Sequence, residues 1–84
     1  MTTEDRVIFV LKELSGIETI SLSDVLLDDL KLDSLSMVAL LLEIEDAFDF
    51  ELKESDMNPF DLNTVADVLA LVTRYTEAQN GKSS

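Results

Sequence analysis

The 84-residue sequence contains no cysteine, histidine or tryptophan, and it has only two glycines and one proline. Without cysteine the chain can form neither disulfides nor thiolate metal sites, so its core must rest on apolar packing alone. Without histidine or cysteine it lacks the commonest acid–base and nucleophilic groups. Gly16 and Gly81 are too far apart for a phosphate-binding loop. We therefore expect no intrinsic catalytic activity.

Basic residues are also scarce. Six lysines and arginines against 18 acids give a net charge of −12. Residues 24–56 alone hold eleven of the acids and two of the bases, hence −9 of that charge. This balance argues against nucleic acid and anionic lipid as partners, and it favours proteins with basic patches. An acidic surface kept only for solubility explains the charge equally well.

Long apolar runs are missing too. The longest, Met37–Leu42, has six residues, far fewer than the roughly 20 that cross a bilayer. Residues 1–6 are acidic, whereas a signal peptide begins with a basic region. We expect a monomeric cytoplasmic protein that forms one domain over residues 1–78, with a disordered tail over residues 79–84. No cluster has the ligand spacing of a metal site, and Asp24, Asp28 and Asp29 do not match a calcium loop.

Three segments have apolar residues at helical spacing. The first is predicted over residues 3–15, with Thr3 as N-cap and Gly16 as the stop. The second is predicted over 34–48, with Asp33 as N-cap, which leaves the Ser34 hydroxyl exposed and free of a capping role.

The last long helix is predicted to open near Asn63 or Thr64, where Thr64 and Asp67 approximate a capping box. Asn58-Pro59 predicts a turn or a short helix. Residues 16–33 have no sustained period, but their leucines predict a long loop anchored to the core. The predicted fold is all-α, a small four-helix bundle of three longer helices and one short helix, with a long first loop.

The second helix has more apolar residues than one face can bury. The surplus predicts either an exposed contact surface or a helix packed between two others. The pattern alone does not decide between them.

With these elements in order, the sequence resembles the acyl carrier protein family, which includes peptidyl and aminoacyl carriers. Three motifs carry the resemblance: D-S-L at Asp33–Leu35, E-x-E-D-x-F at Glu43–Phe48, and T-V-x-D at Thr64–Asp67. Together they extend it over about residues 3–77. The resemblance implies that Ser34 receives 4′-phosphopantetheine covalently from coenzyme A, and that acyl or aminoacyl groups are then held as thioesters and delivered to partner enzymes. The protein would be a carrier and not an enzyme.

The resemblance also implies a docking surface for a phosphopantetheinyl transferase and for acyl- or aminoacyl-loading and condensing enzymes with basic patches. It carries over to these positions: Asp33, Leu35, Val38, Leu42, Glu45, Asp46, Leu52 and Met57. Core packing is the alternative for Leu35 and Val38, and simple solvation is the alternative for Glu45 and Asp46.

The chain departs from the fatty-acid type of carrier near the serine. That type usually has acids two and five positions after the serine, where this chain has Ser36 and Ala39, and Lys31-Leu32 replaces a common Gly-Ala. The departures favour a specialised pathway, such as polyketide, nonribosomal peptide or aminoacyl transfer. A fatty-acid carrier is the first alternative, and an acidic helical interaction module without a prosthetic group is the second.

Overall fold

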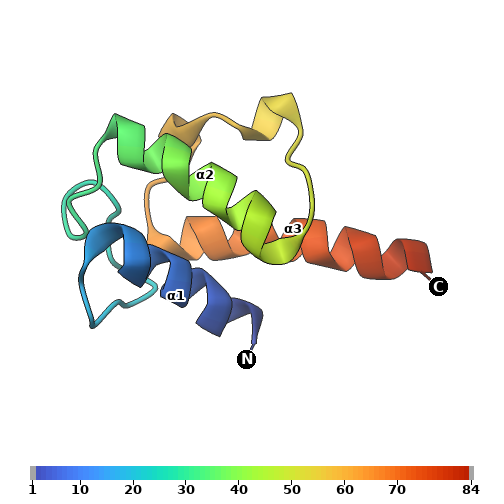
Figure 1. The fold of residues 1–84 in the computed structure, drawn as a ribbon, viewed down its shortest axis with the longest axis horizontal. Coiled ribbons are helices and arrows are strands. Elements are labelled where there is room, and N and C mark those ends of the chain that lie inside the picture. Colours follow the sequence, from blue (N-terminus) through green and yellow to red (C-terminus); the bar gives the residue numbers. More distant parts are fainter. Residues whose placement is uncertain (1, 84) are drawn as a thin grey trace.

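The chain folds into three α-helices joined by two long connections (Figure 1). A computed structural model describes residues 2–83, and for Pro59 and residues 78–83 it describes the backbone alone. The helices are α1 (Thr3–Ser15), α2 (Ser34–Phe48) and α3 (Val65–Ser83), and two 3₁₀ turns, η1 (Glu54–Asp56) and η2 (Pro59–Asp61), precede α3. Residues 2–83 form no strand beyond one isolated bridge between Val25 and Thr64. The all-α prediction is confirmed, and the expected short helix takes the form of the two 3₁₀ turns.

The predicted bounds of α1 are correct, but its cap is not. Thr2, and not Thr3, is the N-cap. The Thr2 hydroxyl accepts the Asp5 amide at 3.1 Å, and an Asp5 carboxylate oxygen accepts the Thr2 amide at 3.2 Å. Gly16 ends the helix at φ 73°, in the left-handed region that glycine adopts without a steric penalty. A reciprocal cap and a glycine stop therefore fix both ends of α1.

The core lies where α1 packs against both α2 and α3. Leucine and valine dominate it, which fits a chain with no disulfide to supplement apolar burial. The first and second helices bury Val7, Val10, Leu11, Met37, Leu40, Leu41 and Ile44, and α3 buries Val65, Val68, Leu71 and Val72.

The first loop, residues 16–33, is anchored as predicted. Leu26, Leu30 and Leu32 are each at most 3% exposed. Backbone bonds also join this loop to the start of α3: the Leu26 amide donates to the Asn63 carbonyl at 2.8 Å, and the Val65 amide donates to the Asp24 carbonyl at 3.0 Å. The loop that leads into α2 is thus packed and hydrogen-bonded like a regular element.

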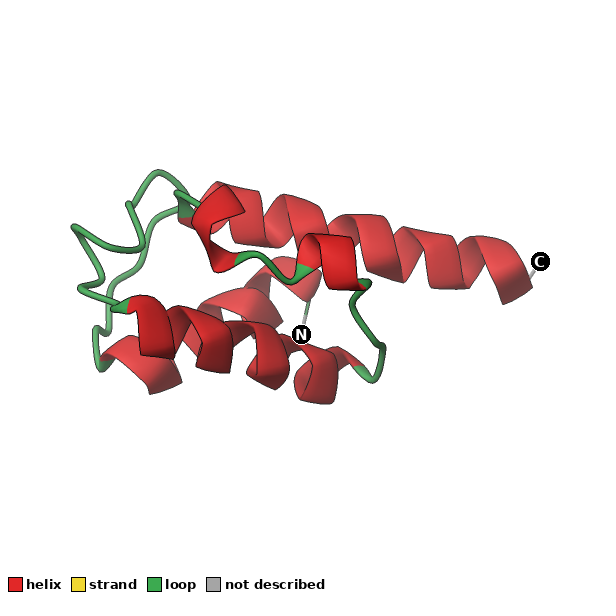
Figure 2. Ribbon diagram, turned by 90° about the horizontal axis from the view of Figure 1, so that it is seen from above, coloured by secondary structure: helices red, strands yellow, loops and turns green. Residues whose placement is uncertain are grey.

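The second connection, residues 49–64, runs back along α2 to the start of α3. Seen from above, η1 and η2 lie over the space between α2 and α3 (Figure 2), and η2 packs against α2. The predicted capping box then opens α3. The Thr64 hydroxyl accepts the Asp67 amide at 3.3 Å, and the Asp67 carboxylate accepts the Thr64 amide at 3.1 Å.

Helix α3 continues to Ser83, past residue 78 where we expected the domain to end. The disordered tail over residues 79–84 stays a prediction, and Ser84 lies outside the described residues. In the described part of the chain, no helix has both the length and the apolar character that a membrane crossing requires.

Candidate functional site

Ser34 is the first residue of α2, and its side chain is exposed. Asp33 caps the helix: its backbone is extended, at φ −92° and ψ −179°, and its Oδ1 accepts the Ser36 amide at 2.7 Å. Within residues 2–83, no hydrogen bond occupies the Ser34 hydroxyl. The division of roles predicted from the sequence is therefore observed, with one side chain capping the helix and the next presenting a hydroxyl to solvent.

Asp33 is held as an anion beside that hydroxyl. The hydrogen bond from the Ser36 backbone amide, supported by the Ser36 side chain, lowers the pKa of Asp33 below its usual value. A carboxylate that accepts such bonds is stabilised in its charged form. The N-terminus of α2 thus carries a negative charge that the helix dipole partly compensates.

The segment that leads into Ser34 contains one residue in a strained backbone conformation, and the side chains of its two neighbours are buried. Lys31 adopts φ 56°, a left-handed conformation that is costly for a residue with a Cβ atom. Leu30 and Leu32 on either side of it are 2% and 3% exposed. These buried neighbours hold the turn in place, and the exposed Lys31 side chain projects three residues before Ser34.

An apolar stripe follows Ser34 along the outside of α2. Leu35 is 79% exposed, Val38 42% and Leu42 54%. Their spacing places them on one face of the helix, and Asp46, also exposed, continues that face by one more turn. Core packing, the alternative for Leu35 and Val38, does not describe these side chains. Their exposure leaves them available for contact, and the contact surface itself stays a prediction.

The other predicted surface residues are placed differently. Leu52 is only 8% exposed and belongs to the core, so it cannot be part of an exposed docking surface in this conformation. Met57 is half-buried against the same core. Glu45 is also half-buried, and its Oε2 accepts the Leu52 amide at 2.7 Å. Glu45 therefore has a structural role, which is to hold the start of the second connection against α2.

Two features near α2 and α3 were not predicted from the sequence. One is Phe60, which is 72% exposed on η2 beside α2. Its backbone is fixed by the Asn58 side chain, whose Oδ1 accepts the Phe60 amide at 3.0 Å. The signal for this turn was the Asn58-Pro59 pair, but the exposure of Phe60 depends on how η2 packs.

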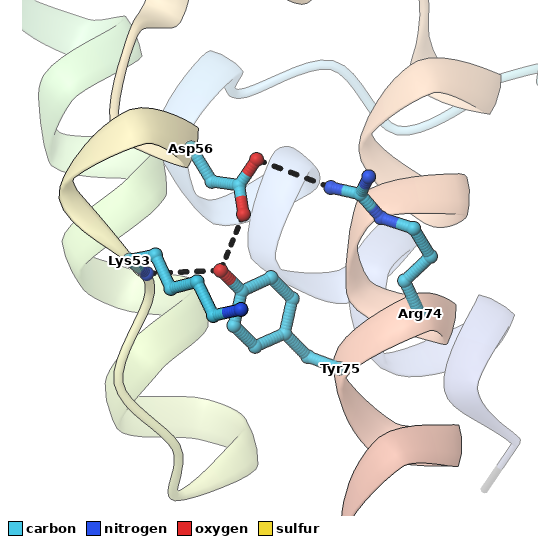
Figure 3. Close-up of polar contacts among 4 residues, drawn as sticks. All are labelled: Lys53, Asp56, Arg74 and Tyr75. Carbon is cyan, nitrogen blue, oxygen red and sulfur yellow. Dashed lines mark hydrogen bonds and ion pairs between the residues drawn. The ribbon is translucent and has the colours of Figure 1, made fainter.

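The other feature is a polar clasp, by which we mean Asp56, Arg74, Tyr75 and the backbone of Lys53 (Figure 3). The Tyr75 hydroxyl donates to Asp56 Oδ2 at 2.5 Å and accepts the Lys53 amide at 2.9 Å. Arg74 donates to Asp56 Oδ1 at 3.2 Å. The clasp therefore ties η1 to α3.

The groups available for a prosthetic attachment are a serine oxygen and the first amides of a helix. An exposed hydroxyl at a helix N-terminus is well placed to form a phosphodiester. The free amides and the helix dipole there stabilise the negative charge of the phosphate. Ser34 meets this requirement, since Asp33 has already taken the capping role. The described residues contain no group of three or more acids, histidines or cysteines arranged to hold a metal ion.

Comparisons with known proteins agree with this geometry. A protein-family model described as a phosphopantetheine attachment site matches residues 5–72. The acyl carrier protein of Chlamydia felis is 32% identical over 80 residues, which cover 92% of this chain and all of that protein. The acyl carrier protein of Clostridium perfringens is 33% identical over 60 residues, or 71% of this chain and 76% of that protein.

A solved structure of a candidate acyl carrier protein from Mycobacterium tuberculosis has the same fold. It aligns with a TM-score of 0.78 and 29% identity, over 88% of this chain and 99% of the other. The sequence motifs, the exposed serine at the head of α2 and these matches agree over nearly the whole chain. This chain belongs to the acyl carrier protein family, whose members carry 4′-phosphopantetheine as a covalent prosthetic group.

Proposed function

We propose that Ser34 is the attachment site of the prosthetic group, and that the carrier serves a specialised pathway. The observation that carries this proposal is the exposed Ser34 hydroxyl at the first position of α2, beside an Asp33 that caps the helix in its place. In the attachment reaction, the Ser34 oxygen forms a phosphodiester with the phosphopantetheine phosphate of coenzyme A. The remaining adenosine bisphosphate leaves, and the hydroxyl proton passes to the transferase.

The residues around Ser34 would each contribute to binding and orientation. The first amides of α2 favour the new phosphodiester, while Asp33 keeps the helix capped before and after the attachment. When bound, the group supplies a thiol on a flexible arm, on which acyl or aminoacyl groups are held as thioesters. The tether keeps the cargo at a high local concentration near a docked partner enzyme.

The docking surface that we propose is smaller than the set predicted from the sequence. It consists of Asp33, the apolar stripe of Leu35, Val38 and Leu42, and Asp46. A partner with an apolar centre and basic side chains at both ends would complement it, because an acid stands at either end of the stripe. The transferase and the loading and condensing enzymes are the proposed partners. Glu45, Leu52 and Met57 would not contact the partner, and they would instead hold the second connection against α2 behind this surface.

The composition of the surface supports a specialised pathway over housekeeping fatty-acid synthesis. Ser36 and Ala39 are half-buried residues of α2 at positions where the fatty-acid type usually presents acids. Leu35 and Val38 are exposed beside them, so the surface near Ser34 is more apolar than acidic. This surface is compatible with polyketide synthesis, with nonribosomal peptide synthesis and with aminoacyl transfer. We further propose that residues 1–78 act as a monomeric carrier domain in the cytoplasm.

Intact-mass measurement tests the attachment site. The protein is incubated with coenzyme A and a broad-specificity phosphopantetheinyl transferase, and it should gain the mass of one phosphopantetheine group. Ser34→Ala should gain nothing. Ser23→Ala is the matched control, because Ser23 is exposed in the first loop, and it should be modified normally. A wild-type protein that gained no mass would leave the acidic interaction module as the better reading.

A further inference from the structure

The loop that leads to Ser34 contains a turn at positive φ, and this chain places a lysine there. Two residues other than glycine have positive φ in the described part of the chain, Lys31 at 56° and Asp49 at 55°. Asp49 ends α2, where its amide donates to the Glu45 carbonyl, and aspartate is one of the few residues that adopt this conformation readily. Lysine is not one of them, so the chain keeps the Lys31 side chain at a backbone cost that glycine would avoid.

The contacts of this turn explain its backbone but not its lysine. The Leu32 amide donates to the Leu26 carbonyl at 3.1 Å, and the side chains of Leu30 and Leu32 are buried on either side of Lys31. The Lys31 side chain itself is exposed, and within residues 2–83 it takes part in no hydrogen bond or ion pair. Backbone strain that the surrounding packing tolerates but does not require is typical of functional positions. The lysine therefore calls for an explanation outside the packing of the loop.

Lys31 stands close to Ser34 along the chain and is exposed with it. Burial alternates in this segment: the buried residues are Leu30 and Leu32, and the exposed ones are Lys31, Asp33 and Ser34. The three residue steps from Lys31 to Ser34 span at most about 10–11 Å between Cα atoms. The flexible four-carbon stem of the lysine and a phosphate on the serine oxygen can together bridge this span. The ammonium group is therefore within reach of a phosphate attached at Ser34.

The charges around Ser34 leave a place for one cation. A phosphodiester on Ser34 would set a second negative charge beside Asp33, whose carboxylate is stabilised as an anion by the Ser36 amide. The dipole of α2 offsets only part of this charge, and the Ser36 amide is already occupied. Lys31 is the only lysine or arginine between residues 13 and 52. It is thus the one side chain of the first loop and α2 that can supply the missing positive charge.

We propose that Lys31 is a positioning residue for the prosthetic group, and that its ammonium group pairs with the phosphodiester formed on Ser34. The inference rests on the proposed function, because it requires the arm to be attached at Ser34. The pairing offsets the charge added beside Asp33 and holds the first atoms of the arm on the side of the first loop. It gives the Lys31 side chain a role that the backbone of the turn does not.

Phosphorus NMR of the modified carrier tests the pairing directly. The wild type, Lys31→Gln, Lys31→Gly and Lys31→Arg are each incubated with coenzyme A and a transferase, and intact mass confirms one phosphopantetheine group per chain. At low salt, the ³¹P chemical shift of the phosphodiester should move in Lys31→Gln and in Lys31→Gly, and Lys31→Arg should restore the wild-type value. Because Lys31→Gly relieves the strained backbone and Lys31→Gln keeps it, agreement between them assigns the effect to charge. Salt at 1 M, where screening acts over about 3 Å, should remove the difference from the wild type.

The change in melting temperature on attachment gives a second measurement. Each modified protein is compared with its own unmodified form, which cancels the effect of the substitution on the bare fold. Since an exposed ion pair contributes modestly, attachment should lower the melting temperature of Lys31→Gln by about 2–4 °C relative to its effect on the wild type. Lys12→Gln is the matched control, because it removes an exposed lysine and the same charge from α1, and it should respond as the wild type does.

The outcomes separate this inference from the proposed function. A ³¹P shift and a melting-temperature change that were the same in the wild type and in Lys31→Gln would overturn the inference and leave the proposed function intact. Equal effects of Lys12→Gln and Lys31→Gln would also overturn it, since net charge alone would then account for them. A wild-type protein that gained no mass would overturn both.

Discussion

Two long connections without α-helix complete the core, and they are held by different kinds of contact. Residues 16–33 are fixed by buried leucines and by backbone bonds to the start of α3. Residues 49–64 bury Phe50, Leu52 and Leu62 less deeply. Their end at Asn63 shares a backbone bond with Leu26, but residues 52–56 are fastened by side chains, namely the clasp and the bond from the Leu52 amide to Glu45. The first arrangement makes a rigid base for Ser34. The second can be released by a change in one or two polar groups.

The largest expected effect comes from breaking the first connection. Leu26 is fully buried, so Leu26→Ala should lower the free energy of unfolding by about 2–5 kcal/mol, because it removes apolar contacts and leaves a cavity. Leu27→Ala is the control, since Leu27 is 52% exposed, and it should change stability by less than about 0.5 kcal/mol. Urea unfolding measures both. Similar losses in the two variants would contradict the view that buried leucines anchor this loop.

Breaking the clasp should cost less and act locally. Tyr75→Phe removes a hydroxyl that bonds both Asp56 and the Lys53 amide, and it should lower the free energy of unfolding by about 1–2 kcal/mol. Combining it with Asp56→Asn in a double-mutant cycle should give a coupling of about 1 kcal/mol. Hydrogen exchange should accelerate at Lys53 and not at Leu26. Equal acceleration at both amides would mean that the two connections open together.

Acid should weaken the clasp before it disturbs the leucine anchors. The Tyr75 hydroxyl, assisted by Arg74, lowers the pKa of Asp56 below its ordinary value of 3.8. A carboxylate with a lowered folded-state pKa contributes stability above the ordinary value and loses it as the pH falls through the folded-state pKa. The stability difference between wild type and Asp56→Asn should therefore be constant from pH 7 to about pH 4.5 and shrink below about pH 3.8. Urea unfolding of both proteins along this range measures it, and parallel curves down to pH 2.5 would contradict it.

The smallest effect concerns two lysines, one in each connection. Lys31→Gly relieves a left-handed backbone at φ 56°, so it should stabilise the fold by about 0.5 kcal/mol after the entropic cost of glycine. Lys53 has an extended backbone at φ −67°, and Lys53→Gly should lose about 0.5–1 kcal/mol. Thermal unfolding of both variants measures the difference. A loss of stability in Lys31→Gly would mean that the lysine side chain itself supports the turn.

Features that depend on neighbouring residues could be predicted from the sequence. The Asp33 cap, the Gly16 stop and the Thr64–Asp67 capping box each involve atoms within four residues of one another. Lys31 also gave a signal, because glycine commonly stands there in the fatty-acid type, and the position does adopt a positive φ. The Thr2 cap was missed by one residue, since Thr2 and Thr3 carry the same side chain.

Contacts between distant segments could not be predicted in this way. Tyr75 and Asp56 are 19 residues apart, and the Arg6 guanidinium, which donates to the Ala47 carbonyl at 2.9 Å, reaches across 41 residues. Arg6 also lies 4.9 Å from the centre of the Phe48 ring, and it supplies the positive charge that the acidic last turn of α2 lacks. Leu52 was assigned to the surface because its burial depends on the path of residues 49–64, which no local pattern reveals.

The cap supplied by Asp33 has a consequence for how partner enzymes recognise this carrier. In the described residues the cap of α2 does not use the Ser34 oxygen, so the attachment that we propose at Ser34 would leave this cap unchanged. A partner enzyme would then meet the same start of α2 before and after the attachment, and at this end of the helix it would distinguish the forms by the arm and by the group that the arm carries.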